Sequence, residues 1–342
     1  MSDPMLDACA DAIGAYPLDG PPDAQLRAVV AFGVQAPSGH NSQPWAFRVH
    51  DGVLDLFADR TRALPVVDPD DRELIISCGA ALLNMRIALQ RFGHDAEVTV
   101  LPEAADPDLL ARVRLGRAHQ PTDDEQALFN AIPRRRTYRH PFEDRAVAAD
   151  LLRMLQAAAE REGAWLHALT AADQRRALAE VIAEGDRRQM AERSFRRELA
   201  VWTHPDRAKS RDGMPGSALG LSALMATVGP LAIRTFDIGK GRAAWDLELA
   251  QRSPALVVLG TRGDGVADWL AVGQALQRVL LRACVDDVFA SFLNQPIEVP
   301  ALRGKVRALV GETGQPQVLL RLGYGHPGRP SPRREVGDVL RG

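Results

Sequence analysis

The stretch that organises the chain is residues 35–45, which read Gln-Ala-Pro-Ser-Gly-His-Asn-Ser-Gln-Pro-Trp. Before it, apolar residues recur with helical spacing over Leu26–Val34, and the pattern stops at Pro37 because proline disfavours a helical residue before it. After it, apolar and polar residues alternate over Trp45–His50, which predicts a strand with one buried face. A loop of small and amide side chains beside rigid elements suits a planar, polar ligand, and a capped helix-to-strand turn is the alternative.

Written as a motif, the stretch is Ala36-Pro37-Ser38-x-x-Asn41-Ser42-Gln43-Pro44-Trp45. It resembles the flavin-contacting motif of the nitroreductase family almost letter for letter. With His40 at the second variable position it is similar to the long, fused chains called Acg-like. The resemblance implies FMN as the cofactor, and it implies that five residues of the stretch contact this flavin: Pro37, Ser38, His40, Asn41 and Gln43.

Composition sets broad limits on fold and partners. With 342 residues the chain is long for one small core, so we expect two core-forming units. A net charge of −2 favours neither a nucleic acid nor a membrane as partner. The three cysteines are far apart, which fits a reducing compartment, and no secretory signal is evident, so we expect a cytoplasmic protein. The histidine and cysteine spacings predict no metal site.

One order of elements is written twice along the chain. In the first half, Asp51-Gly52 marks a hairpin between two strands, and a long helix and a further strand follow. Strand, helix and strand return near the C-terminus, and setting Gly79 against Gly273 aligns the copies through element order more than identity. The expected helices are Glu73–Phe92, Asp150–Glu162, a charged helical segment Ala171–Ala200, and Asp268–Cys284; the further strands are Val53–Phe57, Ala96–Val100, Trp165–Leu169, Ala255–Leu259, Val288–Leu293 and Gln317–Leu322.

We therefore expect an N-terminal extension (1–23), a first half (24–125), a second half (126–330) and a tail (331–342), which its prolines and arginines predict to be mobile. Turn residues over about 203–217 predict a loop that can act as a lid. The resemblance implies an α+β, nitroreductase-like fold. In it, each half has a central mixed or antiparallel sheet flanked by helices, and the halves pack as an intramolecular pseudo-dimer.

A second candidate segment is Arg134–Arg139, which holds four guanidinium groups and a hydroxyl within six residues. Guanidinium forks match phosphate geometry, although a solvated basic turn is the alternative. The segment resembles the Arg-x-Ser-x-Arg/Lys element of nitroreductases, with Thr in place of Ser. That resemblance implies contacts to the FMN phosphate and the pyrimidine edge of the ring. The residues implied are Arg135, Arg136, Thr137 and Arg139.

The two motifs lie in different halves. Because the first half has the loop and the second half has the arginine element, the resemblance implies one complete FMN site between the halves and one degraded site. It also implies Asn294 and Gln295 near the flavin N5, where a plain strand-to-turn connection is the alternative. Arg329 is the candidate for a C-terminal contact to the phosphate, and a disordered tail residue is its alternative.

The resemblance implies an FMN-dependent oxidoreductase that uses NAD(P)H to reduce nitroaromatic or quinone-like small molecules. FMN carries the chemistry in such proteins, so we assign no catalytic side chain. A rival interpretation is a non-catalytic protein that binds or sequesters FMN under the lid. We expect a monomer that acts as a pseudo-dimer, and the sequence leaves further self-association open.

Overall fold

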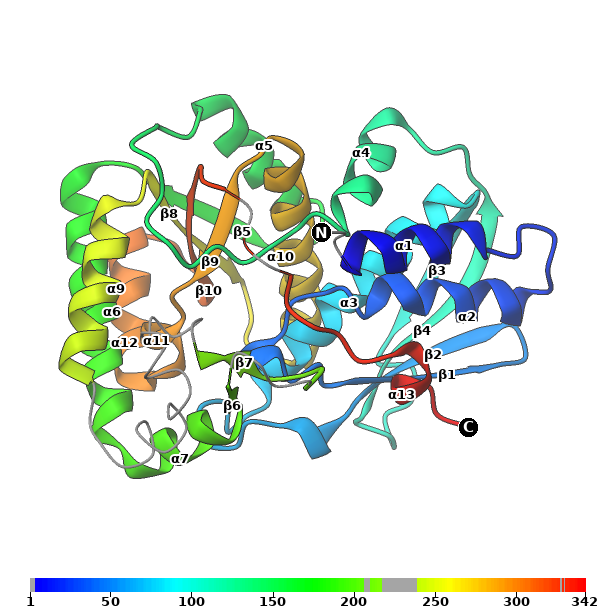
Figure 1. The fold of residues 1–342 in the computed structure, drawn as a ribbon, viewed down its shortest axis with the longest axis horizontal. Coiled ribbons are helices and arrows are strands. Elements are labelled where there is room, and N and C mark those ends of the chain that lie inside the picture. Colours follow the sequence, from blue (N-terminus) through cyan, green and yellow to red (C-terminus); the bar gives the residue numbers. More distant parts are fainter. Residues whose placement is uncertain (1–3, 206–209, 217–238, 327, 329) are drawn as a thin grey trace.

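The computed structural model describes residues 4–205, 210–216, 239–326, 328 and 330–342. Within them lie two four-stranded sheets, one on each side of the molecule (Figure 1). All neighbouring strands in both sheets are antiparallel. The first sheet has the order β1-β2-β4-β3, and its strands are β1 (Trp45–His50), β2 (Val53–Ala58), β3 (His94–Val100) and β4 (Leu109–Ala118). The second has the order β5-β8-β10-β9, and its strands are β5 (Trp165–Leu169), β8 (Ala255–Thr261), β9 (Phe289–Phe292) and β10 (Gln315–Gly323).

Helices cover the sheets and fill the space between them (Figure 1). The helix α1 (Pro4–Gly14) lies in the N-terminal extension, α2 (Pro22–Gly33) and α3 (Arg72–Arg91) belong to the first half, and α4 (Asp123–Ala131) spans the expected boundary between the halves. In the second half they are α5 (Ala149–Glu160), α6 (Ala172–Ala191), α7 (Arg193–Val201), α9 (Gly239–Arg252), α10 (Val266–Val285), α11 (Gln295–Glu298) and α12 (Pro300–Val310). The short helix α13 (Val336–Val339) follows near the C-terminus, and the two-residue strands β6 (Thr203–His204) and β7 (Met214–Pro215) pair in parallel.

The two halves share one topology. In the order of the chain, β1, β2, α3, β3 and β4 correspond to β5, β8, α10, β9 and β10, and the two sheets have the same strand order under this correspondence. The second half differs by the helices inserted between β5 and β8 and between β9 and β10. This shared order of elements agrees with the predicted repeat, which itself stays a prediction.

The halves meet where α3 crosses α10. A Cβ added to Gly79 would lie 2.3 Å from the Leu270 carbonyl oxygen, and one added to Gly273 would lie 2.1 Å from the Ile76 carbonyl oxygen. These contacts are reciprocal, because Ile76 and Leu270 each lie three residues before their glycine. Reciprocity of this kind is what a two-fold relation between halves requires. The backbones approach this closely only because both positions lack a side chain.

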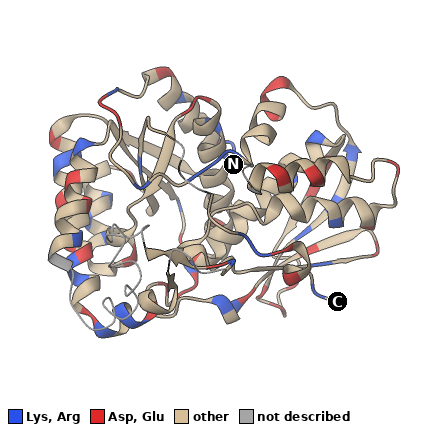
Figure 2. Cartoon of the chain, in the orientation of Figure 1, with Lys and Arg blue, Asp and Glu red and all other residues tan. Residues whose placement is uncertain are grey.

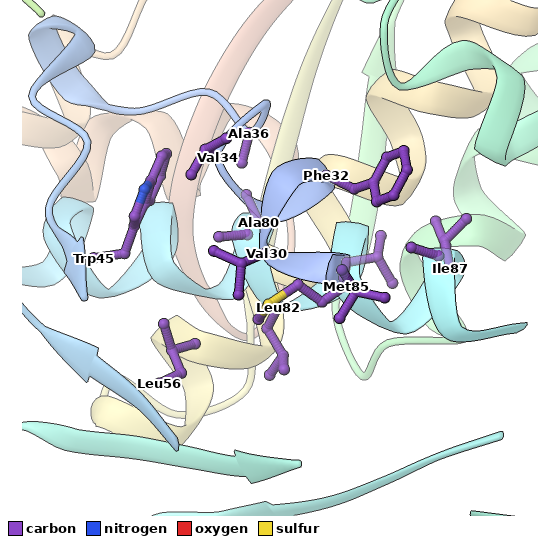
Figure 3. Packing of buried hydrophobic residues seen from close by; sticks show 14 of the residues in the cluster. Val30, Phe32, Val34, Ala36, Trp45, Leu56, Ala80, Leu82, Met85 and Ile87 are labelled. Atoms are coloured by element: carbon purple, nitrogen blue, oxygen red, sulfur yellow. The ribbon is translucent and has the colours of Figure 1, made fainter. Parts of the chain in front are cut away.

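The first core is built around α3. Figure 3 shows Val30 of α2 and Leu82 and Met85 of α3 pointing into the same apolar space, with Leu56 of β2 below them. Among the described residues, α3 is the one helix long and apolar enough to span a membrane, but 89% of its apolar window is buried inside the protein. Its apolar surface is explained by this core.

Most predicted elements are confirmed. The expected helix Glu73–Phe92 is α3, the expected strand Trp165–Leu169 is β5, and the charged helical segment forms α6 and α7. The strand β4 was not predicted, because its pairing with β2 and β3 comes from distant parts of the chain. The helices α1 and α4 were also not predicted.

The C-terminal tail differs from its prediction as a mobile segment. Val339 is buried in the core of the first half, and Leu340 makes a parallel bridge with Phe47 of β1. The Arg341 amide donates to the Phe47 carbonyl oxygen at 2.7 Å. The prolines stop helix formation, but they do not prevent the tail from packing along an open sheet edge.

The helix crossing can be tested with a matched pair of glycines. We expect Gly79→Ala to lower the free energy of unfolding by about 1–3 kcal/mol, since the new Cβ overpacks a backbone contact. In contrast, Gly304→Ala in α12 meets no atom within 4 Å and should be neutral or stabilise by about 0.5–1 kcal/mol. Denaturant unfolding of both variants measures the difference. An unchanged midpoint for Gly79→Ala would contradict the crossing.

Candidate functional site

The motif loop, residues 35–44 between α2 and β1, has an unusual backbone. His40, Asn41 and Gln43 have φ values of 49°, 55° and 53°, in the left-handed region that non-glycine residues seldom adopt. The surrounding hydrogen bonds hold this conformation. The Gln43 amide donates to Ser38 Oγ at 2.9 Å, and the Ser42 amide donates to the Gly39 carbonyl oxygen at 2.9 Å. Strained backbone that is held in this way is typical of a ligand-binding loop.

The arginine segment crosses from the first half to the second and docks beside β9 (Figure 2). Thr137 makes a parallel bridge with Ala290, and the Tyr138 amide donates to the Ala290 carbonyl oxygen at 2.9 Å. The fully buried Arg321 of β10 donates to the carbonyl oxygens of Tyr138 at 2.9 Å and His140 at 3.0 Å. The second half therefore fixes the backbone that carries Arg135 and Arg139.

One cavity brings the two motifs together. Most of the predicted site residues line it: Pro37, Ser38, His40, Asn41, Arg135, Thr137, Arg139, Asn294 and Gln295. Apolar residues from α3, α6, α7, α9 and α10 line it too, among them Ile76, Met190, Phe195, Trp245, Leu249 and Leu276. The cavity thus combines polar groups from the loop and the arginine segment with an apolar wall, the usual composition of a site for a planar organic ligand.

One end of the cavity is cationic. Burial lowers the pKa of Arg135 and of Arg139 to about 10, and burial together with Arg135, Arg136 and Arg139 lowers that of Arg333 to about 9. Among the residues that the structure describes, the buried Nε atoms of Arg135 and Arg333 have no hydrogen-bond partner. Guanidinium groups buried together without a carboxylate make an anion site, and a phosphate matches their geometry.

Arg333 was not predicted as a site residue. It comes from the tail, and its guanidinium donates to Asn41 Oδ1 at 2.9 Å. The neighbouring Arg334 amide donates to Gln43 Oε1 at 2.8 Å, so the tail lies across the motif loop. The adjacent arginines Arg333 and Arg334 were the sequence feature that could have indicated a tail contact to an anion. They were not assigned to the site because the tail was predicted to be mobile. The predicted candidate Arg329 lies outside the described residues.

Two predicted site residues do not line the cavity. Gln43 is fully buried, and its Nε2 donates to the Arg211 carbonyl oxygen at 2.7 Å. Its side chain therefore stabilises the motif loop without lining the cavity. The Arg136 guanidinium donates to the carbonyl oxygens of Pro133 at 2.6 Å and Arg135 at 3.0 Å. Both side chains support the local backbone of a motif.

The described part of the predicted lid, 203–205 and 210–216, is attached to the motif loop. Asn41 Nδ2 donates to the Gly213 carbonyl oxygen at 3.1 Å, and the Gly213 amide lies 3.3 Å from the Asn41 carbonyl oxygen that accepts from it. Arg62 of the first half pairs with Asp212. Residues 206–209 and 217 of the predicted lid lie outside the described part of the chain.

A second wall of the cavity carries carboxyl groups that sequence reasoning did not single out. Gln295 Nε2 donates to Asp186 Oδ1 and Asp246 Oδ2, each at 3.1 Å, and Asn294 Nδ2 donates to Glu73 Oε1 at 3.0 Å. Burial and the Asp246 carboxyl raise the pKa of Asp186 to about 7. The sequence periodicity does not predict that these acids are buried. Asp186 and Asp246 become buried because α6 packs against α9.

His40 is neutral at physiological pH in this setting. Burial, and then the charge of Arg242, lowers its pKa to about 4. A neutral imidazole can donate from one nitrogen and accept at the other, which suits a heterocyclic ring. Among the residues that the structure describes, no group of three or more His, Cys, Asp or Glu side chains could hold a metal ion.

No protein-family model matches the sequence. Curated relatives do match over nearly its whole length. "Putative NAD(P)H nitroreductase Rv3131" of Mycobacterium tuberculosis is 34% identical over 330 residues, which cover 93% of this chain and 92% of that protein. "Uncharacterized protein Rv3127" of the same organism is 32% identical over 328 residues, covering 92% of each. "Putative NAD(P)H nitroreductase acg" is 29% identical over 333 residues, covering 92% of this chain and 95% of that protein.

Solved structures match more distantly. A nitroreductase with bound FMN from Bacteroides fragilis has a TM-score of 0.37 and 15% identity, covering 59% of this chain and 89% of that one. The FMN-dependent nitroreductase NfnB from Mycobacterium smegmatis, in complex with NADPH, has a TM-score of 0.39 and 16% identity, covering 64% and 99%. These scores are too low to carry over a binding mode. Identity with the curated relatives over nine-tenths of the chain decides the family: this protein belongs to the nitroreductase family, in the group that includes Acg.

Proposed function

We propose that the protein is an FMN-dependent oxidoreductase that uses NAD(P)H to reduce nitroaromatic or quinone-like small molecules. The observation that carries the proposal is the convergence, in one cavity, of the motif loop from the first half with Arg135 and Arg139 from the second. Curated relatives named as NAD(P)H nitroreductases support the reaction class. The chemistry that bound FMN supplies is hydride acceptance and release.

The residues present fit FMN. Two buried guanidinium nitrogens, Arg135 Nε and Arg333 Nε, lack a partner among residues 4–205, 210–216, 239–326, 328 and 330–342 and lie at the cationic end, where a phosphate would receive their hydrogen bonds. Thr137 offers a hydroxyl on the same segment. We therefore assign the phosphate contacts to Arg333 and to the arginine segment. Arg136 is not among them, because its guanidinium donates to backbone carbonyl oxygens.

The flavin ring would lie between the motif loop and the residues that follow β9. Ser38, His40 and Asn41 provide neutral polar groups on one side, and Asn294 and Gln295 line the cavity on the other. A neutral ring needs such groups and not additional cations. The apolar wall leaves a surface on which a flat donor or acceptor can stack.

We also infer that the chain is an intramolecular pseudo-dimer, a fused pair of nitroreductase-like halves. The shared strand order and the reciprocal contact at Gly79 and Gly273 support this inference. The motifs are divided between the halves, so one site is complete. The cysteines Cys9, Cys78 and Cys284 are all buried, in keeping with a cytoplasmic location.

A second candidate function is the storage of FMN without turnover. The attachment of residues 210–216 to the motif loop through Asn41 and Gln43 favours it, because a segment held there can restrict access to the ring. Mixing the purified protein with NADH or NADPH without air separates the two functions. Rapid bleaching of the flavin supports the oxidoreductase, and a spectrum that stays oxidised supports storage.

The phosphate assignment predicts a ligand-specific loss of affinity. Arg135→Ala, Arg139→Ala and Arg333→Ala should each weaken FMN binding about tenfold to a hundredfold, as a charge-assisted hydrogen bond is worth about 1.5–3 kcal/mol. Thr137→Val should cost less, because a neutral hydroxyl is lost. Quenching of flavin fluorescence measures each affinity, and riboflavin, which has no phosphate, is the matched ligand.

The exposed residue Arg307 of α12 provides the control substitution, Arg307→Ala. This variant should bind FMN as the wild type does. The arginine variants should bind riboflavin with nearly unchanged affinity. An equal loss for FMN and riboflavin would show that the arginines stabilise the fold of the site and not the phosphate.

The division of the motifs predicts one FMN per chain. Flavin released by denaturation, measured by absorbance against protein concentration, should give a ratio near one. A ratio near two would mean that the second interface between the halves also binds flavin, in spite of its lack of an arginine element.

A further inference from the structure

A pair of carboxyl groups lines the same cavity as the buried arginines. Asp186 of α6 and Asp246 of α9 are both buried, and the same amide nitrogen, Gln295 Nε2, lies 3.1 Å from an oxygen of each. Gly185 makes this approach feasible, since a Cβ there would lie 2.9 Å from the Gln295 carbonyl carbon. The helix α6 thus packs directly on the segment that carries Gln295.

The charges of this group are not balanced. Arg242 Nε lies 2.9 Å from Asp246 Oδ2 and 3.9 Å from Asp186 Oδ1, so one guanidinium serves two carboxyl groups. Asp186 Oδ2 and Gln295 Oε1 are buried, have no hydrogen-bond partner within the described part of the chain, and belong to residues that line the cavity. A second buried negative charge without a partner is costly, so the pair retains a proton.

The charge of Asp246 also acts on Arg321 of β10, and that of Glu298 acts on Arg242. Other charged groups on the elements packed against α6 have partners of their own. They are Glu184, which pairs with Lys305 of α12 and with Arg188; Glu298 of α11, which accepts from Gln189; and Arg196 of α7, which donates to the Met190 carbonyl oxygen. Asp246 and Arg242 are therefore the charged groups that act on Asp186, and they raise and lower its pKa respectively, with burial as the largest cause of its rise to about 7.

We propose that Asp186 and Asp246 share one proton near neutral pH and donate it to a carbonyl oxygen of the electron acceptor, which makes a quinone the preferred acceptor class. Met190, Trp245 and Leu249 lie on the same two helices and line the same cavity, so an apolar ring has a surface beside the pair. This proposal rests on the proposed function. It adds a proton donor to a site for which the sequence indicated no catalytic side chain.

The proton balance of the reaction requires such a donor. Conversion of a quinone to a hydroquinone takes two electrons and two protons. Under the proposed function, both electrons and one proton arrive as a hydride equivalent that originates from NAD(P)H. The pair supplies the other proton: an O–H bond forms on the carbonyl oxygen as the carboxylic O–H bond breaks, and water then reprotonates the pair.

The first test compares two acceptors. In Asp186→Asn and Asp246→Asn, we expect kcat/KM for 1,4-naphthoquinone to fall about a hundredfold, a typical contribution of a proton donor. Reduction of ferricyanide, which takes electrons without a proton, should be unchanged. Glu184→Gln is the matched control, because it exchanges a carboxyl group on the same helix that does not line the cavity. A structural defect would lower both rates.

The second test needs no turnover. Without reductant, the affinity of the oxidised protein for 1,4-naphthoquinone should fall about tenfold between about pH 6 and about pH 8.5, because the pair loses the proton that it donates in a hydrogen bond. In Asp186→Asn the affinity should not depend on pH over this range. A pH-independent affinity in the wild type would overturn the proposal.

Stability gives an independent measure of the shared proton. Because the pKa of Asp186 rises from its ordinary value of 3.8 to about 7 in the folded protein, the folded state binds more protons than the unfolded state between these values. The free energy of unfolding must therefore fall as pH rises through this window. Asp186→Asn should gain stability relative to the wild type from about pH 5 to about pH 8, whereas Glu184→Gln should show a constant difference.

The outcomes separate this proposal from the proposed function. Loss of quinone reduction with retained ferricyanide reduction supports the proton donor. Equal loss of both, or unchanged quinone reduction in both aspartate variants, overturns it while leaving the oxidoreductase in place. If the wild type reduces neither acceptor, the proposed function fails, and the binding titration alone decides about the pair.

Discussion

The close crossing of α3 and α10 at Gly79 and Gly273 is the contact on which the rest of the structure depends. It allows two backbones to meet where side chains would hold them apart. The motif loop precedes the N-terminus of α3 along the first half, and the arginine segment docks on β9, which follows α10. The distance between these segments is therefore set by one helix pair, and neither half contains both sets of groups that line the cavity.

Burial of charge gives the cavity walls of different chemistry. At one end, guanidinium groups lie together and their pKa values are lowered, which favours any ligand that brings negative charge. On another wall, carboxyl groups lie together and the pKa of Asp186 is raised, which favours a retained proton. Desolvation causes both shifts. The phosphate of a ligand would meet the guanidinium groups. A carbonyl oxygen of an acceptor beside the neutral ring would meet the carboxyl groups.

The tail connects the halves a second time. It packs on β1 through Val339 and Leu340, and it delivers Arg333 to the cationic end by way of Asn41. Asn41 therefore links its own loop to two other segments, the tail and residues 210–216, since its side chain also donates to the Gly213 carbonyl oxygen. This arrangement explains why the strained loop conformation persists: hydrogen bonds from two distant segments determine it. Asn41, a residue of the predicted flavin motif, thus also stabilises the packing of these segments.

The sequence by itself determined the family, the α+β class and the two motifs, because these follow from local patterns: the letters of residues 36–45, helical and strand periodicity, and guanidinium spacing. It could not determine that β4 completes the first sheet, that Arg333 joins the cationic cluster, or that Gln43 and Arg136 turn away from the cavity. It also did not reveal Asp186 and Asp246. Each of these depends on partners far along the chain, and only tertiary packing decides which polar groups are buried together and which lose their water.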